Sequence, residues 1–201
     1  KLKNKKVRVG IRLNPNTDAK TLNQISTGKK ENKFGVNKNT FHKIVNFCKK
    51  RNIKIIEDAA ESLASKDSNK KRNAGIEYSC YSFNGNKLIT SGGGGLISIK
   101  NERKYQQAIY LASQAKKDSI QFIHDDVGHN FLLSNLHACI GLSQLLNINK
   151  VLKRKEEINR IYKNKINKIN GLEILTPPKN CKPNNWLNVL IVNEKLMCPQ
   201  E

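Results

Sequence analysis

Long apolar runs, paired cysteine motifs and acidic residues are all scarce in this sequence of 201 residues. No stretch approaches the roughly 18 consecutive apolar residues that a membrane helix requires, so we expect no membrane-spanning segment in it. The five cysteines form no C-x-x-C pair, and no histidine stands at a metal-binding spacing from them. The cysteine pattern therefore predicts no metal site and no disulfide framework, and it favours a reducing cytoplasm.

The shortage of acidic residues leaves a large positive charge, since 16 Asp and Glu stand against 37 Lys and Arg, giving +21 at pH 7. Such a charge is typical of nucleic-acid-binding domains, which remain an alternative. The basic residues, however, are spread over every polar stretch, and the aromatic residues on which bases would stack make up only 6%. This even spread argues against a nucleic-acid partner. A general bias of the sequence towards Lys, Asn and Ile explains the positive charge more simply.

Helical and strand patterns alternate along the chain. Apolar residues recur at three- and four-residue steps in the expected helices, whereas the expected strands are short runs rich in β-branched residues. We expect strands at 7–13, 53–56, 78–83 and 96–99, and helices at 40–51, 102–115, 132–146 and 148–169. The helix 132–146 is apolar enough to be largely buried, and Cys48, Cys80 and Cys139 are expected in the core. This order predicts an α/β fold, in which ligands bind beyond the carboxyl ends of strands.

One lysine, Lys87, stands between an apolar strand and a glycine run, in the segment CYSFNGNKLITSGGGG at 80–95. An amine held in a fixed, partly desolvated place becomes nucleophilic enough to form a Schiff base. Neighbouring glycines allow the backbone to approach a flat cofactor closely. A phosphate-binding P-loop is excluded, because its lysine follows the glycines whereas Lys87 precedes them. A surface lysine beside a tight turn is the alternative.

Three carboxylates follow the expected strand 53–56, at Glu57, Asp58 and Glu61. A carboxylate at the end of a strand can pair with the protonated ring nitrogen of pyridoxal phosphate, which makes that ring an electron sink. A solvated acidic turn has the same composition, so this segment by itself leaves both interpretations open.

These two features occur in a fixed order with other short blocks. The blocks are IEDAAES at 56–62, SFNGNK at 82–87, TSGGGG at 90–95, HDDVGHN at 124–130, SNLHA at 134–138 and NNWLN at 184–188. Across residues 52–193 the chain resembles the fold-type-I pyridoxal-phosphate aminotransferases of the DegT/DnrJ/StrS type, which act on nucleotide sugars. The FNGNK and NNWLN blocks most resemble the members that make 4-amino UDP-sugars on the bacillosamine and legionaminic-acid routes.

The resemblance implies a role for each matching residue. Lys87 would form the internal aldimine and then move a proton between the amino donor and the cofactor. Asp58 would pair with the pyridine nitrogen, Glu61 would lie near the ring, and Ser82 would bind the phosphate. Asn130 would reach the cofactor phosphate of a neighbouring subunit, which implies a homodimer. The implied reaction moves an amino group, with glutamate as the expected donor, to the 4-keto carbon of a UDP-linked deoxysugar in the cytoplasm.

The beginning of the sequence does not follow this pattern. Residues 7–35 resemble instead the barrel domain of diaminopimelate-decarboxylase-like enzymes, which also use pyridoxal phosphate, so an amino-acid decarboxylase is a further alternative. We predict a decarboxylase-like segment at 1–36, a junction helix at 37–51, a large-domain portion at 52–147, and a linking helix with the start of a small domain at 148–201. The expected fold is thus a partial fold-type-I large domain, mostly parallel sheet with helices. Its N-terminal half and C-terminal end are missing, so we expect these 201 residues alone to bind the cofactor weakly or not at all.

Overall fold

The structure, a computed structural model, describes residues 10, 38–67, 76–118, 120–177 and 181–193. The chain divides into two compact units. The first consists of residues 54–161 and 177–187, and the second of residues 1–53, 162–176 and 188–201. The strand expected at 7–13 lies, apart from Gly10, outside the described residues. The predicted domain boundaries stay a prediction.

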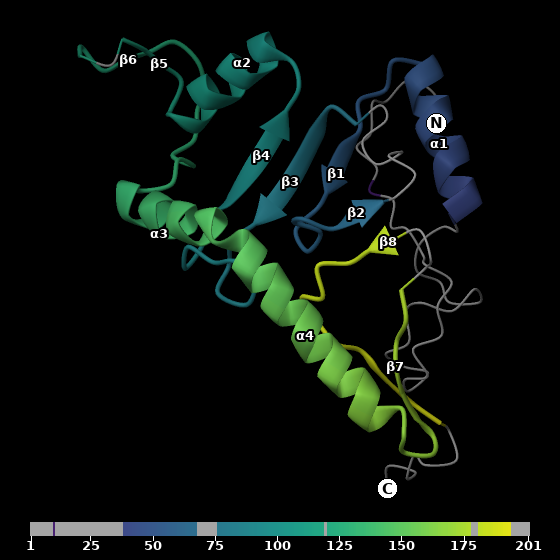
Figure 1. Cartoon of the computed structure of the whole chain (residues 1–201). Helices are drawn as coiled ribbons and strands as arrows, with labels where there is room; N and C mark the ends of the chain where they lie inside the picture. Colours follow the sequence, from purple (N-terminus) through teal and green to yellow (C-terminus); the bar gives the residue numbers. More distant parts are fainter. Residues whose placement is uncertain (1–9, 11–37, 68–75, 119, 178–180, 194–201) are drawn as a thin grey trace, which may run out of the picture. The chain divides into compact units, whose positions relative to one another are not determined.

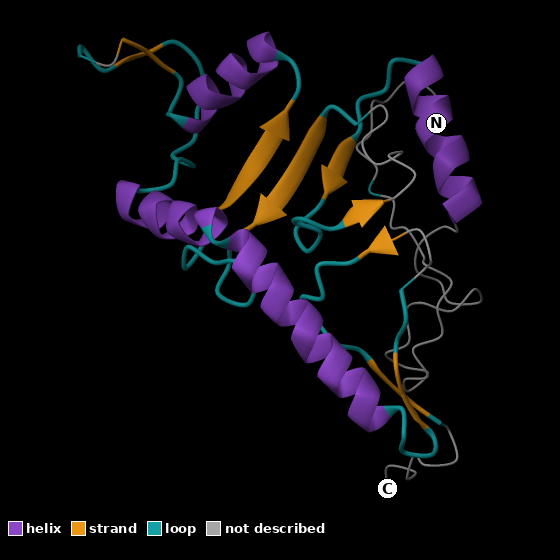
Figure 2. Cartoon of the chain, viewed as in Figure 1, coloured by secondary structure: helices purple, strands orange, loops and turns teal. Residues whose placement is uncertain are grey.

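The first unit contains a three-stranded sheet in the order β1–β3–β4 (Figures 1 and 2). Strand β1 (Ile56–Asp58) pairs in parallel with β3 (Tyr78–Ser82), and β3 pairs antiparallel with β4 (Gly95–Ile99). The expected α/β architecture is confirmed, and the described sheet is mixed in direction. Strand β1 lies later than the predicted 53–56, because the parallel register pairs Ile56 with Tyr78 and Asp58 with Cys80. Asp58 is therefore the last residue of the strand itself.

The loop between β3 and β4 has a small core of its own. Phe83, Ile89 and Ser91 are buried in it. The Phe83 N–H donates to the Gly94 carbonyl at 3.0 Å, and the Phe83 carbonyl accepts from the Ser91 N–H at 3.0 Å. A Cβ atom on Gly95 would lie 2.2 Å from the carbonyl oxygen of Tyr81. Glycine is thus required where the loop enters β4, because the neighbouring strand leaves no room for a side chain.

Three helices follow the sheet: α2 (Glu102–Ala112), α3 (Asn135–Leu146) and α4 (Ile148–Ile166). Helix α2 ends before the predicted residue 115 because Gln114 and Ala115 adopt positive φ angles of 69° and 51°. Helix α3 begins after Ser134, whose side chain caps it by accepting a hydrogen bond from the His137 N–H. It therefore starts later than the predicted residue 132.

Two short strand pairs complete the first unit. Strands β5 (Lys116–Asp118) and β6 (Ile123–His124) form a hairpin between α2 and α3. Strand β2 (Lys66–Asp67) pairs antiparallel with β8 (Cys181–Lys182). This second pairing brings the segment 181–187 beside the residues that follow β1.

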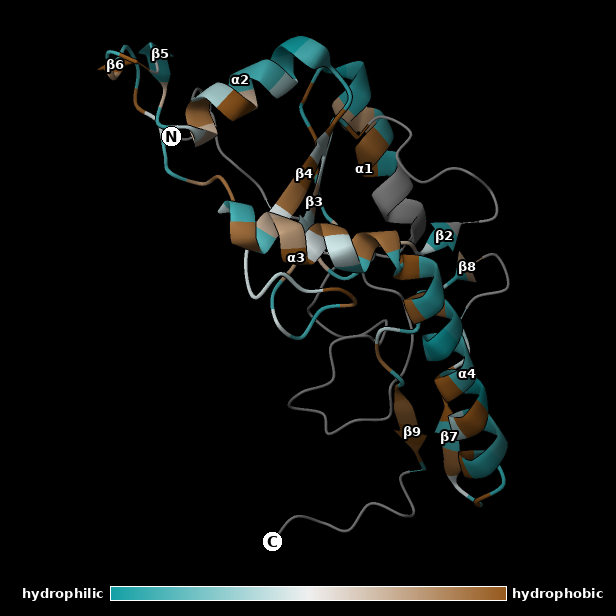
Figure 3. Cartoon of the chain, turned by 60° about the vertical axis from the view of Figure 1, so that its left-hand side comes forward, coloured by the Kyte–Doolittle hydropathy of each residue, from teal (hydrophilic) through white to brown (hydrophobic). Residues whose placement is uncertain are grey.

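Helix α3 is exposed, which makes the prediction of a largely buried helix at 132–146 wrong. Gly141 is its only buried residue, whereas Leu136 is 75% exposed and Leu146 is 78% exposed. Figure 3 shows hydrophobic residues along this helix. Cys139 is exposed as well, and Cys48 and Cys80 are only half-buried, so the expectation that all three lie in the core is also wrong. Apolar composition indicates that a helix needs a covering surface, but no element in the described part of the chain supplies one for α3.

The second unit contains α1 (Lys38–Lys50), the end of α4, and an antiparallel pair of β7 (Leu172–Ile174) and β9 (Leu190–Val192). Helix α1 agrees with the predicted 40–51, whereas α4 stops before the predicted residue 169. Ile174, the last residue of β7, is only 2% exposed and pairs with Leu190 of β9. Gly171 begins this pair with a φ of 82°, which glycine adopts without steric cost. None of the described helices has both the length and the apolar character needed to cross a membrane.

Candidate functional site

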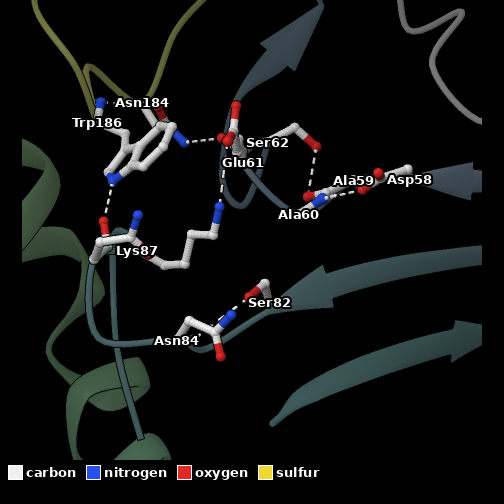
Figure 4. Close-up of polar contacts among 11 residues, drawn as sticks. Asp58, Ala59, Ala60, Glu61, Ser62, Ser82, Asn84, Lys87, Asn184 and Trp186 are labelled. Atoms are coloured by element: carbon white, nitrogen blue, oxygen red, sulfur yellow. Dashed lines mark hydrogen bonds and ion pairs between the residues drawn. The ribbon is translucent and has the colours of Figure 1, made fainter. Parts of the chain in front are cut away.

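The candidate site lies at the carboxyl ends of two neighbouring parallel strands. Asp58 ends β1 and Ser82 ends β3, and because these strands run in the same direction both residues stand at one edge of the sheet. Lys87 follows in the loop after β3 (Figure 4). Three residues predicted from the sequence are thus brought to the same sheet edge, the place where α/β folds bind ligands.

Lys87 is held in a defined position by its loop and by two side chains. Its backbone N–H donates to the Asn84 carbonyl at 3.0 Å, which closes a turn. The side chain is 14% exposed, although lysine is mostly exposed in proteins. Its Nζ lies 3.2 Å from Oε1 of Glu61 and 4.8 Å from the centre of the Trp186 ring. The lysine amine is therefore enclosed between a carboxylate and an aromatic face (Figure 4).

Asp58 and Glu61 have different surroundings. Asp58 is exposed, and its Oδ1 accepts a hydrogen bond from the Ala60 N–H at 3.1 Å, which orders the turn after β1. The carboxylate partner of Lys87 is Glu61, whose side chain is 61% exposed. Burial raises the pKa of the neighbouring Cys80 thiol, and the negative charges of Asp58 and Glu57 raise it further. This end of the sheet is thus electronegative apart from the Lys87 amine.

Ser82 is half-buried, and its hydroxyl oxygen accepts a hydrogen bond of 3.4 Å from the Asn84 N–H. The hydroxyl therefore takes part in the start of the turn that leads to Lys87. Its contact supports the loop, and no described contact links Ser82 directly to the Lys87 amine.

Asn130 lies on a different element from these residues. It stands between the β5–β6 hairpin and α3, forms an isolated antiparallel bridge with Ser113, and is exposed. The adjacent backbone is tied to α2, since the His129 N–H donates to the Leu111 carbonyl at 2.7 Å and the Phe131 N–H donates to the Ala112 carbonyl at 3.0 Å. The structure thus presents Asn130 on a fixed segment, with its side chain accessible.

Gln144 of α3 is a site-supporting residue that sequence reasoning missed. Its side-chain oxygen accepts from the Thr90 N–H at 3.0 Å, and its amide nitrogen donates to the Thr90 carbonyl at 2.7 Å. The Thr90 hydroxyl in turn donates to the Phe83 carbonyl at 3.0 Å. Gln144 therefore holds the loop that carries Lys87, and a glutamine in an apolar helix was the only sequence signal that could have indicated it.

Asn184 and Trp186 belong to the NNWLN block at 184–188, to whose residues the sequence motifs assigned no role. Asn184 is 6% exposed, and its Nδ2 donates to the Glu61 carbonyl at 2.9 Å and to the Leu63 carbonyl at 3.0 Å. Its Oδ1 accepts from the Trp186 N–H at 3.0 Å. The Trp186 indole N–H donates to the Asn86 carbonyl at 2.6 Å. Segment 184–186 thus contacts both the turn after β1 and the loop that carries Lys87.

Comparison with protein families identifies two matches along the chain. Residues 32–200 match the model of the DegT/DnrJ/EryC1/StrS aminotransferase family. Residues 1–57 match the model of the pyridoxal-dependent decarboxylase, pyridoxal binding domain. Both resemblances that the sequence motifs carry are therefore confirmed, and the two matches overlap before and within β1.

Individual relatives include a putative aminotransferase and a GDP-perosamine synthase. The chain is 33% identical over 153 residues to the putative pyridoxal phosphate-dependent aminotransferase EpsN of Bacillus subtilis, covering 76% of this chain and 39% of EpsN. It is 37% identical over 126 residues to GDP-perosamine synthase of Escherichia coli O157:H7, covering 63% of this chain and 35% of that enzyme. The chain thus spans little more than a third of the length of these relatives.

A solved structure supports the same assignment. The aminotransferase PseC of Helicobacter pylori, described as involved in the biosynthesis of pseudaminic acid, superimposes with a TM-score of 0.66 at 26% identity. The match covers 77% of this chain and 42% of PseC. The described fold is therefore a partial version of a sugar-aminotransferase fold.

Proposed function

This chain belongs to the DegT/DnrJ/EryC1/StrS aminotransferase family, and from that premise we propose that it takes part in pyridoxal-phosphate-dependent amino transfer to a nucleotide-linked sugar. Pyridoxal phosphate is the cofactor that both matched families indicate. Because the chain spans less than half of its relatives, the activity of the whole enzyme is part of the proposal.

The observation that carries the proposal is the enclosed amine of Lys87 at the sheet edge where Asp58 ends β1. The residues present fit the cofactor, because it needs an amine for its aldehyde and a carboxylate for its ring nitrogen. The low exposure of Lys87 supports a role beyond that of a solvated surface cation. Ser82, at the same edge, supplies a hydroxyl for the phosphate group.

When bound, pyridoxal phosphate supplies an electron sink that stabilises negative charge at the carbon atom next to the amine. In this proposal Lys87 holds the cofactor and moves protons at its Nζ atom. The Asp58 carboxylate keeps the ring nitrogen protonated. Glu61 lies against the same amine, 3.2 Å from Nζ, so it can hold the lysine until the cofactor arrives.

The substrate is proposed from the names of the relatives. They include GDP-perosamine synthase and a UDP-4-amino-4,6-dideoxy-N-acetyl-β-L-altrosamine transaminase of Campylobacter jejuni, which is 27% identical over 170 residues. Both names point to amino sugars on nucleotide diphosphates. We propose a 4-keto nucleotide-linked sugar as acceptor and glutamate as donor, in the cytoplasm.

A homodimer is the proposed assembly. Its support is the accessible Asn130 together with the exposed apolar side chains of residues 127–146, among them Val127, Phe131, Leu132, Leu136, Ile140 and Leu146. An apolar surface of this kind is typical of an interface between subunits. A second copy of this face would cover those side chains and bring Asn130 to a neighbouring cofactor.

A decarboxylase contribution remains a second candidate for the N-terminal segment alone. It rests on the family match over residues 1–57. We propose that this match marks a segment of different origin joined to the aminotransferase portion. Release of carbon dioxide from diaminopimelate by the chain with pyridoxal phosphate would favour a functional decarboxylase segment.

The proposed role of the Lys87 amine is tested by reductive coupling of pyridoxal phosphate to the 201-residue chain. In this reaction the lysine nitrogen and the aldehyde carbon become joined by a C–N single bond, cyanoborohydride supplies the hydride, and water leaves. We expect coupling mainly at Lys87 and only at high cofactor concentration. Lys87→Ala should abolish it, whereas the exposed Lys117→Ala should not. Uniform coupling at all lysines would contradict the proposed cofactor site.

Amino transfer itself is measured with glutamate and a 4-keto UDP- or GDP-sugar, in a full-length enzyme that contains the aminotransferase portion of this chain. Lys87→Ala should lower the rate by about 10²–10⁴-fold, because the proton-transfer group is removed. Unchanged transfer by the Lys87→Ala enzyme would exclude Lys87 as the catalytic amine.

A further inference from the structure

Segment 184–186 supplies one of the two groups that enclose the Lys87 amine, the Trp186 ring, and it binds the backbone of the other, Glu61. We propose that Asn184 and Trp186 are positioning residues for Lys87. The functional part of this proposal rests on the proposed role of Lys87 as the cofactor amine, whereas its geometric part depends only on the described contacts.

Asn184 acts on both partners of the amine. Its Nδ2 donates a hydrogen bond of 2.9 Å to the backbone carbonyl of Glu61. Its Oδ1 accepts a hydrogen bond of 3.0 Å from the backbone N–H of Trp186. Its own N–H donates to the Ser65 hydroxyl at 3.2 Å. A buried side chain whose donors and acceptor are all used cannot move without leaving polar groups unpaired. Asn184 therefore fixes the spacing between the backbones of Glu61 and Trp186, from which the carboxylate and the ring extend.

Trp186 connects this arrangement to the loop that carries Lys87. Its indole N–H donates to the Asn86 carbonyl at 2.6 Å, one residue before the lysine. Its ring face lies 4.8 Å from the lysine nitrogen, within the range of a cation–π contact. The indole thus fixes both the start of the lysine side chain, through the backbone, and its end, through the ring.

A lysine side chain has four rotatable bonds and loses much freedom when it is held in one place. Without the indole ring, the Glu61 carboxylate would be the one remaining described contact of Nζ, and it is 61% exposed. An ion pair whose carboxylate is largely in solvent holds its partner side chain weakly. The position of the amine therefore depends on Trp186, and the position of Trp186 depends on Asn184.

The first measurement needs no cofactor. Reductive ¹³C-methylation places two methyl groups on each lysine nitrogen and preserves the positive charge, and Lys87→Arg assigns the Lys87 signal. In the 201-residue chain the ring current of Trp186, which is the only tryptophan in the sequence, should displace that signal from those of the other lysines. The displacement should vanish in Trp186→Leu and Asn184→Ala and persist in part in Trp186→Phe.

The second measurement couples pyridoxal phosphate reductively to the unmethylated chain and quantifies the product at Lys87. We expect Trp186→Leu and Asn184→Ala to lower coupling at Lys87 by about tenfold or more, since displacement of a reacting group by about 1 Å costs up to 100-fold. Trp186→Phe should recover most of it, because a ring face remains. Leu187→Ala, at a 61% exposed position directly after segment 184–186, is the matched control and should change neither measurement.

The outcomes separate the two proposals. An unshifted Lys87 signal in the unaltered chain, or one that Trp186→Leu leaves in place, overturns the positioning role. A shifted signal with unchanged coupling in Trp186→Leu overturns its functional part. A further outcome is a Lys87 signal that is shifted in the unaltered chain and loses its shift in Trp186→Leu, while pyridoxal phosphate couples to no lysine selectively. That result supports the positioning of the amine and rejects the cofactor site. If Asn184→Ala does not fold, Trp186→Leu and Trp186→Phe decide the question alone.

Discussion

The loop between β3 and β4 and the segment 127–146 differ in how far their apolar side chains are buried. The loop buries Phe83, Ile89 and Ser91 within the same unit and uses Gln144 to bind the backbone of Thr90. Segment 127–146 leaves large apolar side chains in solvent, with Val127 79% exposed and Leu136 75% exposed. The loop is complete within this chain, whereas the apolar segment requires a further surface.

The difference explains why the two regions have different roles in the proposed function. The loop carries Lys87, and a reacting amine must be held by contacts present before any ligand binds. The apolar segment carries Asn130, whose proposed target belongs to another subunit. Contacts within the chain hold Lys87, whereas in the proposed homodimer contacts with a second chain would position Asn130.

The largest expected effect tests the closed packing of the loop. Gly95→Ala should destabilise the chain by about 1–3 kcal/mol, because the added Cβ would meet the Tyr81 carbonyl at 2.2 Å. Gly93→Ala is the matched control, since no heavy atom lies within 4 Å of its added Cβ. Urea unfolding of both variants measures the difference. Equal stability of the two variants would show that the loop can relax away from β3.

The next effect tests the apolar segment. Leu136→Gln should weaken self-association by about 2 kcal/mol, or about thirtyfold in Kd, if a second copy covers this face. Sedimentation equilibrium of the chain measures the Kd. Leu187→Gln, at an exposed apolar position outside segment 127–146, should leave it unchanged. A chain that is monomeric at all concentrations would reject the proposed homodimer of this segment.

A smaller effect is expected where the two regions meet, at Gln144. Gln144→Leu removes both hydrogen bonds to the Thr90 backbone and should cost about 1–2 kcal/mol in the free energy of unfolding. The exposed Gln107→Leu should stay within about 0.5 kcal/mol of the unaltered chain. A neutral Gln144→Leu would mean that the loop keeps its conformation without α3.

The smallest effect concerns the base of the β5–β6 hairpin. The hydrogen bond that the Tyr110 hydroxyl donates to Asp125, together with desolvation and the negative charges of Asp125 and Asp126, raises the pKa of Tyr110 to about 12, and the hydrogen bond is the largest of these causes. A raised folded-state pKa means that this contact stabilises the fold fully below about pH 10, and that the stabilisation is lost as the pH rises through 12.

Spectrophotometric titration of the tyrosines measures this shift. One phenol should ionise near pH 12 and should be missing from the titration of Tyr110→Phe. Asp125→Ala should return it towards the range of an ordinary tyrosine. An unshifted titration in the unaltered chain would show that the hairpin is not held by this contact in solution.

Local features of the site could be predicted from the sequence because they depend on neighbouring residues. A lysine between a strand and a glycine run indicated the loop that carries Lys87, and carboxylates after a β-branched run indicated the turn after β1. Both predictions place a residue type near the end of an element, and such placement follows from periodicity and turn chemistry within a few positions. The start of β1 was misplaced, because the register with β3 is a contact between distant segments.

Taken alone, the sequence determined the α/β class, the approximate positions of the four helices and of β1, β3 and β4, the family, and the candidate residues Lys87, Asp58, Glu61, Ser82 and Asn130. Only the tertiary structure decided that the Lys87 amine contacts Glu61 and Trp186, and that Asn184 joins the segments of both. Asn184 and Glu61 are 123 positions apart, so no local pattern relates them. The exposure of α3 was decided in the same way. Apolar composition makes burial of the helix favourable, but the path of the whole chain determines whether another element packs against it.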